Sequence, residues 1–381
     1  MTNNISHGLK ISLLVLATMG VMSGITIVAS LPLIAKEFSH IQHIDFYSKL
    51  LLTIPSIIIA IFAPLAGILI DRVGKLKPLY IAIFMFILGG SSGFYLTDFY
   101  MILAGRALLG LSVAIIGTVL LTLISDFYTE EEQKKLLSLK GMVIGLSGIV
   151  FIILGGYLAK MGWEYPFLLY LLPIIFLPLW IRYLHEPHHE PQNNKDTSKS
   201  FAKLWYVYLT AFFSMSLFYT LPTQLPYLII NTLQSDPQRV AYIIAFAMFI
   251  NAMTAMNYHK LKRHLSFTHI FMIGYFLFSI GFFIISQVTA SYQLFFSSFF
   301  IGAGFGLTLV NINVWLLSKL QNFNKGHAIG ILTSSMFLGQ FFSPLFAELF
   351  IENIGIQGLF LLMSGVLSLM VLALLIVTRY R

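Results

Sequence analysis

Long apolar stretches alternate with short polar segments along the whole chain. The stretches fall at roughly 9–34, 46–70, 78–96, 99–124, 136–160, 164–185, 203–231, 237–258, 266–287, 292–317, 327–350 and 355–378. Each has about 20 residues or more, which is the length of a helix that crosses a bilayer, whereas a membrane-spanning strand needs only about 10. The pattern therefore predicts an all-α membrane protein with twelve transmembrane helices.

The composition agrees with this pattern and narrows the function. Of the 381 residues, 58% are hydrophobic and 10% are charged, whereas soluble domains carry about 25% charged residues. The chain has no cysteine, which excludes disulfides, thiol chemistry and cysteine-ligated metals. It also carries no phosphate-binding loop, catalytic triad or zinc-peptidase helix. We therefore expect no enzyme activity, no cofactor and no metal site.

The net charge of +8 is distributed according to membrane topology. With the amino terminus inside, 18 of the 23 Lys and Arg residues lie in inner loops, and four lie outside: Lys36, Lys49, Lys160 and Arg239. This bias predicts that both termini are cytoplasmic in a bacterial inner (plasma) membrane. The basic residues form no continuous face with aromatic neighbours, so nucleic-acid binding is not expected.

A polar stretch divides the chain, and the two halves resemble each other. Residues 140–145 (KGMVIG) and 325–330 (KGHAIG) open the fifth and eleventh apolar stretches, six stretches apart. We expect an N-terminal six-helix bundle at 1–184, a cytoplasmic linker at 185–203 and a C-terminal six-helix bundle at 204–381. The linker contains His185, His188, His189 and Glu190, which we do not interpret as a metal site. Two pseudo-symmetric bundles are one architecture for alternating access, with the substrate between them.

The loop at 67–78 (GILIDRVGKLKP) resembles the loop motif G-x-L-a-D-R-x-G-R-K of the major facilitator superfamily (MFS). The resemblance implies the MFS fold, in a drug or metabolite efflux-like branch. It also implies a conformational latch, in which the glycines permit close packing and a tight turn, Asp71 meets a helix end or an arginine, and Lys75 faces the cytoplasm. The alternative is that the basic residues only follow membrane topology. The latch residues are Gly67, Asp71, Arg72, Gly74 and Lys75.

Arg106 lies inside the fourth apolar stretch, where 106–111 (RALLGL) resembles the family motif R-x-x-Q-G with Leu109 in place of Gln. An arginine in the middle of a membrane helix costs ~2.5–3.5 kcal/mol on insertion scales. Either Arg106 contacts the solute or takes part in coupling, or it satisfies helix carbonyls without touching the solute. The repeat places Ser298 at the equivalent position of the other half.

Two further helices carry features of the same resemblance. The antiporter motif G-x-x-x-G-P-x-x-G-G of the fifth span is degraded here, because 151–152 (FI) replaces its Gly-Pro pair. Gly148, Gly155 and Gly156 remain for helix packing, which favours export. In the seventh span, Pro222 and Pro226 each remove a helical hydrogen bond and predict a bent, gating helix.

The resemblance implies that spans 1, 4, 7 and 10 line the solute cavity. Polar residues on these helices are the candidates for solute binding, although small polar residues also serve helix packing. The candidates are Ser23, Thr26, Arg106, Gln224, Tyr227, Asn311 and Trp315.

The absence of Asp and Glu well inside any predicted span disfavours lipophilic cations, because a buried cation needs a partner. We therefore expect a secondary active transporter that exports a small neutral or anionic organic solute, such as a drug-like compound, sugar or secreted metabolite. Proton coupling rests on the resemblance alone, with a facilitator or anion exchange as competitors. The alternatives are an uptake symporter or facilitator for a siderophore or organic acid, and a non-transporting sensor or scaffold. We expect a monomer in the lipid bilayer.

Overall fold

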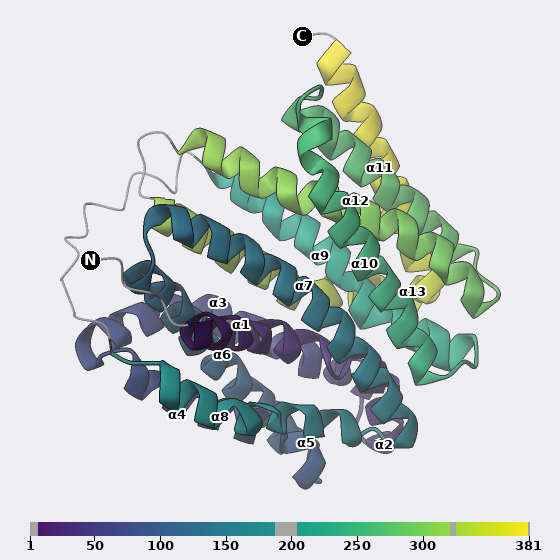
Figure 1. Cartoon of the computed structure of the whole chain (residues 1–381). Coiled ribbons are helices and arrows are strands. Elements are labelled where there is room, and N and C mark those ends of the chain that lie inside the picture. Colours follow the sequence, from purple (N-terminus) through teal and green to yellow (C-terminus); the bar gives the residue numbers. More distant parts are fainter. Residues whose placement is uncertain (1–6, 187–203, 321–324, 380–381) are drawn as a thin grey trace. The chain divides into compact units, whose positions relative to one another are not determined.

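The computed structural model describes residues 7–186, 204–320 and 325–379, and these residues form helices with no β-strand among them (Figure 1). They fall into two compact units, Met1–Asn193 and Asn194–Arg381. The expected linker at 185–203 lies almost entirely outside the described residues.

The first unit contains six membrane-crossing segments. Its elements are α1 (His7–Ile25), η1 (Val28–Ser30), α2 (Leu31–Glu37), α3 (Ile44–Val73), α4 (Leu76–Gly90), α5 (Ser92–Tyr95), α6 (Phe99–Phe127), α7 (Glu130–Met161), η2 (Tyr165–Leu171) and α8 (Pro173–Tyr183). The first crossing is broken into α1, η1 and α2. The break lies within the run Ile25-Thr26-Ile27-Val28, whose β-branched side chains disfavour helix, and Pro32 then lies in the first turn of α2.

The second unit also contains six crossings. Its elements are α9 (Trp205–Tyr227), the π-helical turn η3 (Leu228–Thr232), α10 (Pro237–Lys262), α11 (Phe267–Ser286), η4 (Ser291–Gln293), α12 (Leu294–Lys319) and α13 (Lys325–Arg379). Helix α13 holds two crossings, because Gly355 interrupts it with φ +69° and ψ 175°. A positive φ combined with ψ near 180° is open essentially to glycine alone, so the chain can turn back at this residue.

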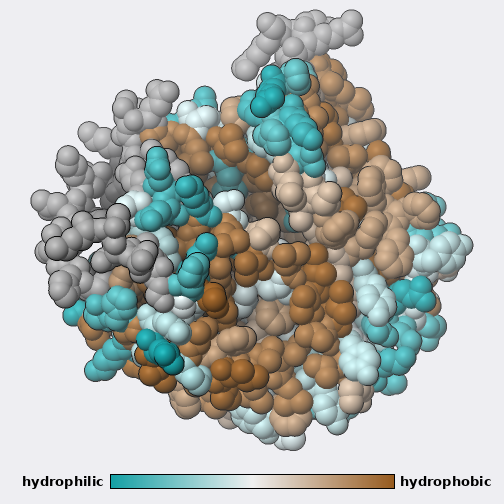
Figure 2. Space-filling view, viewed as in Figure 1, coloured by the Kyte–Doolittle hydropathy of each residue, from teal (hydrophilic) through white to brown (hydrophobic). Residues whose placement is uncertain are grey.

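The helices have the length and surface of membrane spans. Nine of the described segments are long and apolar enough to cross a bilayer, one of them being the double crossing α13. Large apolar side chains point outward from both units, such as Ile175 (70% exposed) and Met256 (72%). Figure 2 shows such side chains over wide areas of the visible face. A surface of this kind is compatible with lipid rather than water.

The same helix packing recurs in both units at an interval of 192 residues. A Cβ built on Gly110 of α6 would lie 2.7 Å from the Pro55 Cα of α3, and one built on Gly302 of α12 would meet the Ala247 carbonyl of α10. Both members of the pair shift by 192, from 110 to 302 and from 55 to 247. These glycines let backbones approach closely, which is a common device between membrane helices. Each unit thus contains the same close contact between two of its helices.

Candidate functional site

Arg106 lies in the interior of the first unit, on α6, with none of its surface exposed. Its Nε donates to the Leu51 carbonyl at 2.7 Å, its Nη2 donates to the Ser23 carbonyl at 2.5 Å, and its Nη1 donates to the Tyr170 hydroxyl at 2.8 Å. The guanidinium also lies 5.3 Å from the centre of the Tyr170 ring. Three helices and η2 therefore meet at this side chain.

Both carbonyls that bind Arg106 lack their normal helical donor. Leu51 lies four residues before Pro55 in α3, and a proline has no N–H to offer to that carbonyl. Ser23 lies in the last turn of α1, which ends at Ile25, so its carbonyl is one of the unpaired groups of a helix end. An unpaired buried carbonyl costs ~1–3 kcal/mol. Arg106 thus satisfies two backbone groups that the sequence itself leaves without a donor.

The electrostatic surroundings also favour a cation at this place. The carboxyl end of a helix carries partial negative charge, and α1 ends beside the guanidinium. The Tyr170 hydroxyl, besides accepting from Arg106, donates to the Met22 carbonyl at 3.2 Å in the same final turn of α1. Arg106 and Tyr170 together cap the end of α1, which corresponds to the second of the two roles considered for Arg106 from the sequence.

The other candidates in the first unit are bonded to their own helix. The Ser23 hydroxyl donates to the Gly20 carbonyl at 2.7 Å, and the Thr26 hydroxyl donates to the Met22 carbonyl at 2.7 Å. Both side chains are buried. Arg106 does contact Ser23, but it binds the Ser23 backbone carbonyl and not the hydroxyl.

Gln224 and Tyr227 lie in the C-terminal half of α9, and every residue from 219 to 229 is buried. Neither side-chain atom of Gln224 has a hydrogen-bond partner among the described residues, although the residue is fully buried. An orphaned buried amide is rare, because each unsatisfied group carries a desolvation penalty. The hydrogen-bonding capacity of the Gln224 side chain is therefore unused within the described residues.

Asn311 and Trp315 on α12 face neighbouring helices of the second unit. The Asn311 amide accepts from the Tyr258 hydroxyl at 2.8 Å and donates to the Phe267 carbonyl at 2.9 Å. The Trp315 ring packs 5.5 Å from that of Phe271. Both residues were expected to line the solute cavity. In the structure their side chains contact α10 and α11.

The predicted latch segment was expected to be a loop, but its residues up to Val73 form the last turns of α3, and the turn follows at Gly74. Gly74 adopts φ +90°, which accounts for a glycine at this turn. Asp71 and Arg72 are exposed, and no atom lies within 4 Å of a Cβ built on Gly67. Lys75 was expected to face the cytoplasm; instead it is 5% exposed, and its ammonium forms an ion pair with Asp126 at the end of α6.

Glu186, which follows α8, binds the backbone of the turn between α3 and α4. Its carboxylate accepts from the Lys75 backbone N–H at 2.6 Å and from the Leu76 N–H at 2.9 Å. It thereby caps the start of α4, where an anion is favourable.

Tyr128 lies in the connection after α6. Burial is the main cause that raises the pKa of Tyr128 above its ordinary value, and the nearby Glu132 carboxylate is the second, so this phenol stays neutral.

The glycines of the fifth span lie in packed positions on α7. Gly148, Gly155 and Gly156 are all buried. A Cβ on Gly155 would collide with the Thr26 carbonyl, next to the break in the first span. This glycine lets α7 approach the broken segment closely.

Several residues of these sites were missed from the sequence. Tyr170, Asp126 and Glu186 received no role. Lys49 was counted among the basic residues of the outer side, and its burial in α3, where it is 2% exposed, was not foreseen. Pro55 could have indicated the binding place of Arg106 from the sequence, because a proline leaves the carbonyl four residues before it, that of Leu51, without a donor. The candidate histidine and glutamate ligands at 188–190 lie outside the described residues, and within the described ones no group of three His, Asp or Glu could hold a metal.

Comparisons with known proteins give a family and a fold. The family model described as Major Facilitator Superfamily matches residues 11–321 and 207–381. The Bacillibactin exporter of Bacillus subtilis (strain 168) is 32% identical over 144 residues, which are 36% of this chain and 35% of that relative. The match therefore spans about a third of the length of that curated relative.

Solved structures resemble the whole chain. A bacterial homologue of the human lysosomal transporter Spinster, in an inward-facing and occupied conformation, has a TM-score of 0.76 and 13% identity, with 97% of this chain and 96% of that chain covered. A D-xylose–proton symporter has a TM-score of 0.73 and 16% identity, with 96% of each chain covered. At such identities the likeness shows the fold alone.

Proposed function

The chain belongs to the major facilitator superfamily, a family of secondary transporters, and from this membership we propose that it exports a small neutral or anionic organic solute by alternating access. The direction rests on one observation, the 32% identity over 144 residues with the Bacillibactin exporter. Bacillibactin, or a metabolite of similar chemistry, is accordingly the first solute to test.

The charges of the described spans support the proposed solute class. Arg106 is a buried cation, and the carboxylates of the described spans lie within about two turns of a helix end or of the Gly355 kink. A cationic solute in such an interior would have no negative partner and would carry an unfavourable desolvation energy. Neutral and anionic solutes avoid that penalty.

We assign Arg106 a positioning role in this function. It fixes the break of the first span through the Ser23 carbonyl and links that break to α3 through the Leu51 carbonyl. Irregular backbone at membrane depth is tolerated where it lines a cavity or is buried in protein, and broken helices recur at the solute sites of transporters. The solute would then meet the broken segment of the first unit. Gln224 of the second unit stays a proposed solute-binding residue in its own right.

The remaining roles are proposals of the same kind. The segment 67–75, which comprises the end of α3 and the turn after it, acts as the latch, with Lys75 anchored by Asp126. Residues 185–203 join the two bundles, and the protein works as a monomer in a bacterial inner membrane with both termini inside.

Everted membrane vesicles test the direction of transport. Vesicles from cells that make the protein should accumulate bacillibactin added outside, because their cytoplasmic face is turned outward. Vesicles without the protein, and vesicles with Arg106→Met, provide the controls. Loss of preloaded bacillibactin through the protein, without accumulation, would establish uptake in place of export.

A further inference from the structure

The turn between α10 and α11, residues 263–266, differs from its counterpart in the first unit. At the interval of 192 residues, the position of Gly74 in the α3–α4 turn falls on Ser266. The turn reads Arg263-His264-Leu265-Ser266, so it carries neither the glycine nor an acidic residue. The features on which the proposed latch rests are therefore missing here, and other contacts hold this turn in the second unit.

Asn311 of α12 joins both sides of the turn. Its side chain is fully buried. Its Oδ1 accepts from the Tyr258 hydroxyl of α10 at 2.8 Å, and its Nδ2 donates to the carbonyl of Phe267, the first residue of α11, at 2.9 Å. An amide carries an acceptor on one atom and donors on the other. Reversing it would set its oxygen against the Phe267 carbonyl oxygen, so the two bonds depend on this one orientation.

Lys262, the last residue of α10, binds the turn from its other side. Its ammonium donates to the Leu265 carbonyl at 3.3 Å and lies 3.8 Å from the centre of the Phe267 ring, over which a cation is favourable. These short-range contacts attach the turn to the end of α10. Helix α12 is distant in sequence, and the Asn311 amide attaches it to both helices that the turn connects.

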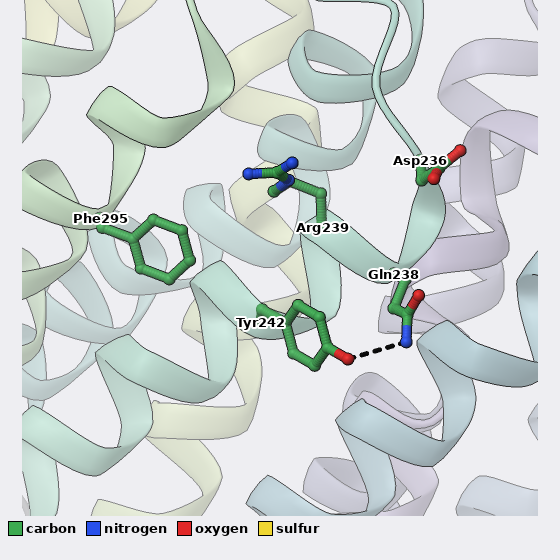
Figure 3. A pocket seen from close by; sticks show the side chains of 5 residues that line it. All are labelled: Asp236, Gln238, Arg239, Tyr242 and Phe295. Carbon is green, nitrogen blue, oxygen red and sulfur yellow. Dashed lines mark hydrogen bonds between the residues drawn. The ribbon is translucent and has the colours of Figure 1, made fainter.

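The two ends of α10 meet α12 differently. Near the end of α10, Tyr258 packs with Ile270 of α11 and Leu307 of α12 in a buried apolar core. Near its start, a pocket of about 260 Å³ lies between α10 and α12 (Figure 3), and Gln238 there donates to the hydroxyl of Tyr242 in its own helix at 2.8 Å. The bridging amide thus belongs to one end of the unit, where it joins three helices.

We propose that Asn311 is a positioning residue of the transport cycle. It makes the ends of α10 and α12 and the start of α11 move as one block, and it takes the place of the latch features that this turn lacks. Both polar atoms of its amide are engaged, so a solute that bound there would compete with these two bonds. The inference rests on the proposed transport function, because helices that move as one block matter to a protein that alternates between conformations.

Spin labels test the block without any solute. The chain has no cysteine, so Lys260→Cys on α10 and Ser318→Cys on α12, both at exposed positions, place one label on each helix of the intact protein. Electron paramagnetic resonance should give a narrow distance distribution for this labelled parent. The distribution should broaden after Tyr258→Phe, which removes only the hydroxyl, and after Asn311→Asp, which removes the donor to Phe267.

Asn313→Asp is the matched control on the same helix. The Asn313 amide is exposed and donates to the Leu309 carbonyl of its own helix at 2.8 Å. This change should therefore keep the narrow distribution. Equal widths in Asn311→Asp, Tyr258→Phe and the labelled parent would overturn the proposal.

Transport kinetics separate positioning from solute contact. In proteoliposomes supplied with bacillibactin, Tyr258→Phe and Asn311→Asp should lower the turnover by about tenfold, which corresponds to ~1.4 kcal/mol, and leave KM nearly unchanged. A raised KM at unchanged turnover would place Asn311 in contact with the solute and overturn the proposal. If the parent carries no bacillibactin, the proposed solute is wrong, and the spin-label widths alone decide the role of Asn311.

Discussion

At the scale of single residues, Arg106 supplies hydrogen-bond donors to two backbone carbonyls of the first unit that have none from their own helix. Pro55 removes the donor of the Leu51 carbonyl, and the end of α1 at Ile25 removes the donor of the Ser23 carbonyl. Arg106 reaches both. A guanidinium suits this task because its N–H groups point in several fixed directions at once and it remains charged. The cost of burying the charge is offset by these bonds and by the negative end of α1.

Arg106→Lys should therefore impair the protein although the charge is kept. An ammonium on a flexible stem cannot reach two carbonyls and the Tyr170 hydroxyl in their present directions. At least one carbonyl would lose its donor, at ~1–3 kcal/mol. We expect lower thermal stability in detergent and loss of most bacillibactin flux, measured by a melting curve and by vesicle uptake.

The repeat supplies a matched control for Arg106. Ser298 occupies the equivalent position in α12, is buried, and its hydroxyl has no partner among the described residues. Ser298→Ala should thus leave the melting temperature unchanged or slightly higher. If Arg106→Lys melts and transports like the parent, the capping role of Arg106 is wrong.

At the scale of elements, the hydrophobic pattern was sufficient to predict the spans but not their interruptions. Lipid as solvent requires long apolar helices, and this requirement is visible along the sequence. The break after Ile25 is not, because Ile25, Ile27 and Val28 are as apolar as the rest of the span. Lys75 was misjudged for a related reason: topology places a lysine on the inner side of the membrane, but only the structure shows Asp126 at the end of another helix.

The Lys75–Asp126 pair should show strong coupling in a double-mutant cycle. Asp126→Asn leaves the nearly buried Lys75 ammonium without its counterion, and removing one partner of a buried pair costs ~3–5 kcal/mol. The actual cost should be smaller than this, because the Asp126 side chain is 27% exposed and solvent screens the interaction. We expect each single change, Asp126→Asn or Lys75→Met, to lower thermal stability, and the double change to cost less than the sum. Additive effects would show that the pair contributes little.

The packing of α4 on α6 gives a second prediction at this scale. A Cβ on Gly89 would lie 2.5 Å from the Gly105 carbonyl and 2.9 Å from the Leu109 nitrogen, both backbone atoms that cannot move away. Gly89→Ala should separate the helices and lower the melting temperature. Gly117→Ala, in the same unit but with nothing within 4 Å of the added carbon, should be neutral or stabilising by up to ~1 kcal/mol. Equal effects of the two changes would contradict close α4–α6 packing.

At the scale of the whole molecule, the two units share a packing scheme but not their charges. The helix contacts repeat at an interval of 192 residues, whereas Arg106 and the Lys75–Asp126 pair have no charged counterpart in the second unit, which carries Ser298 at the position of Arg106. The scheme is visible in the sequence only as short matches, since glycines that allow close approach differ little from other glycines until their neighbours are known. The one-sided charge makes the interior of the first unit positive.

This one-sided charge leads to a prediction about the driving force. In the part of the chain that the structure describes, the middles of the spans hold no Asp, Glu or His, and a proton-coupled carrier normally uses such a group. An anion, by contrast, leaves an inside-negative cell with a gain of ~2.3 kcal/mol per charge at 100 mV. In energised everted vesicles, whose lumen is positive and acidic, nigericin should dissipate the pH gradient without slowing accumulation of an anionic solute. Valinomycin with potassium should dissipate the potential and slow it. If nigericin alone stops accumulation, the transport is coupled to protons.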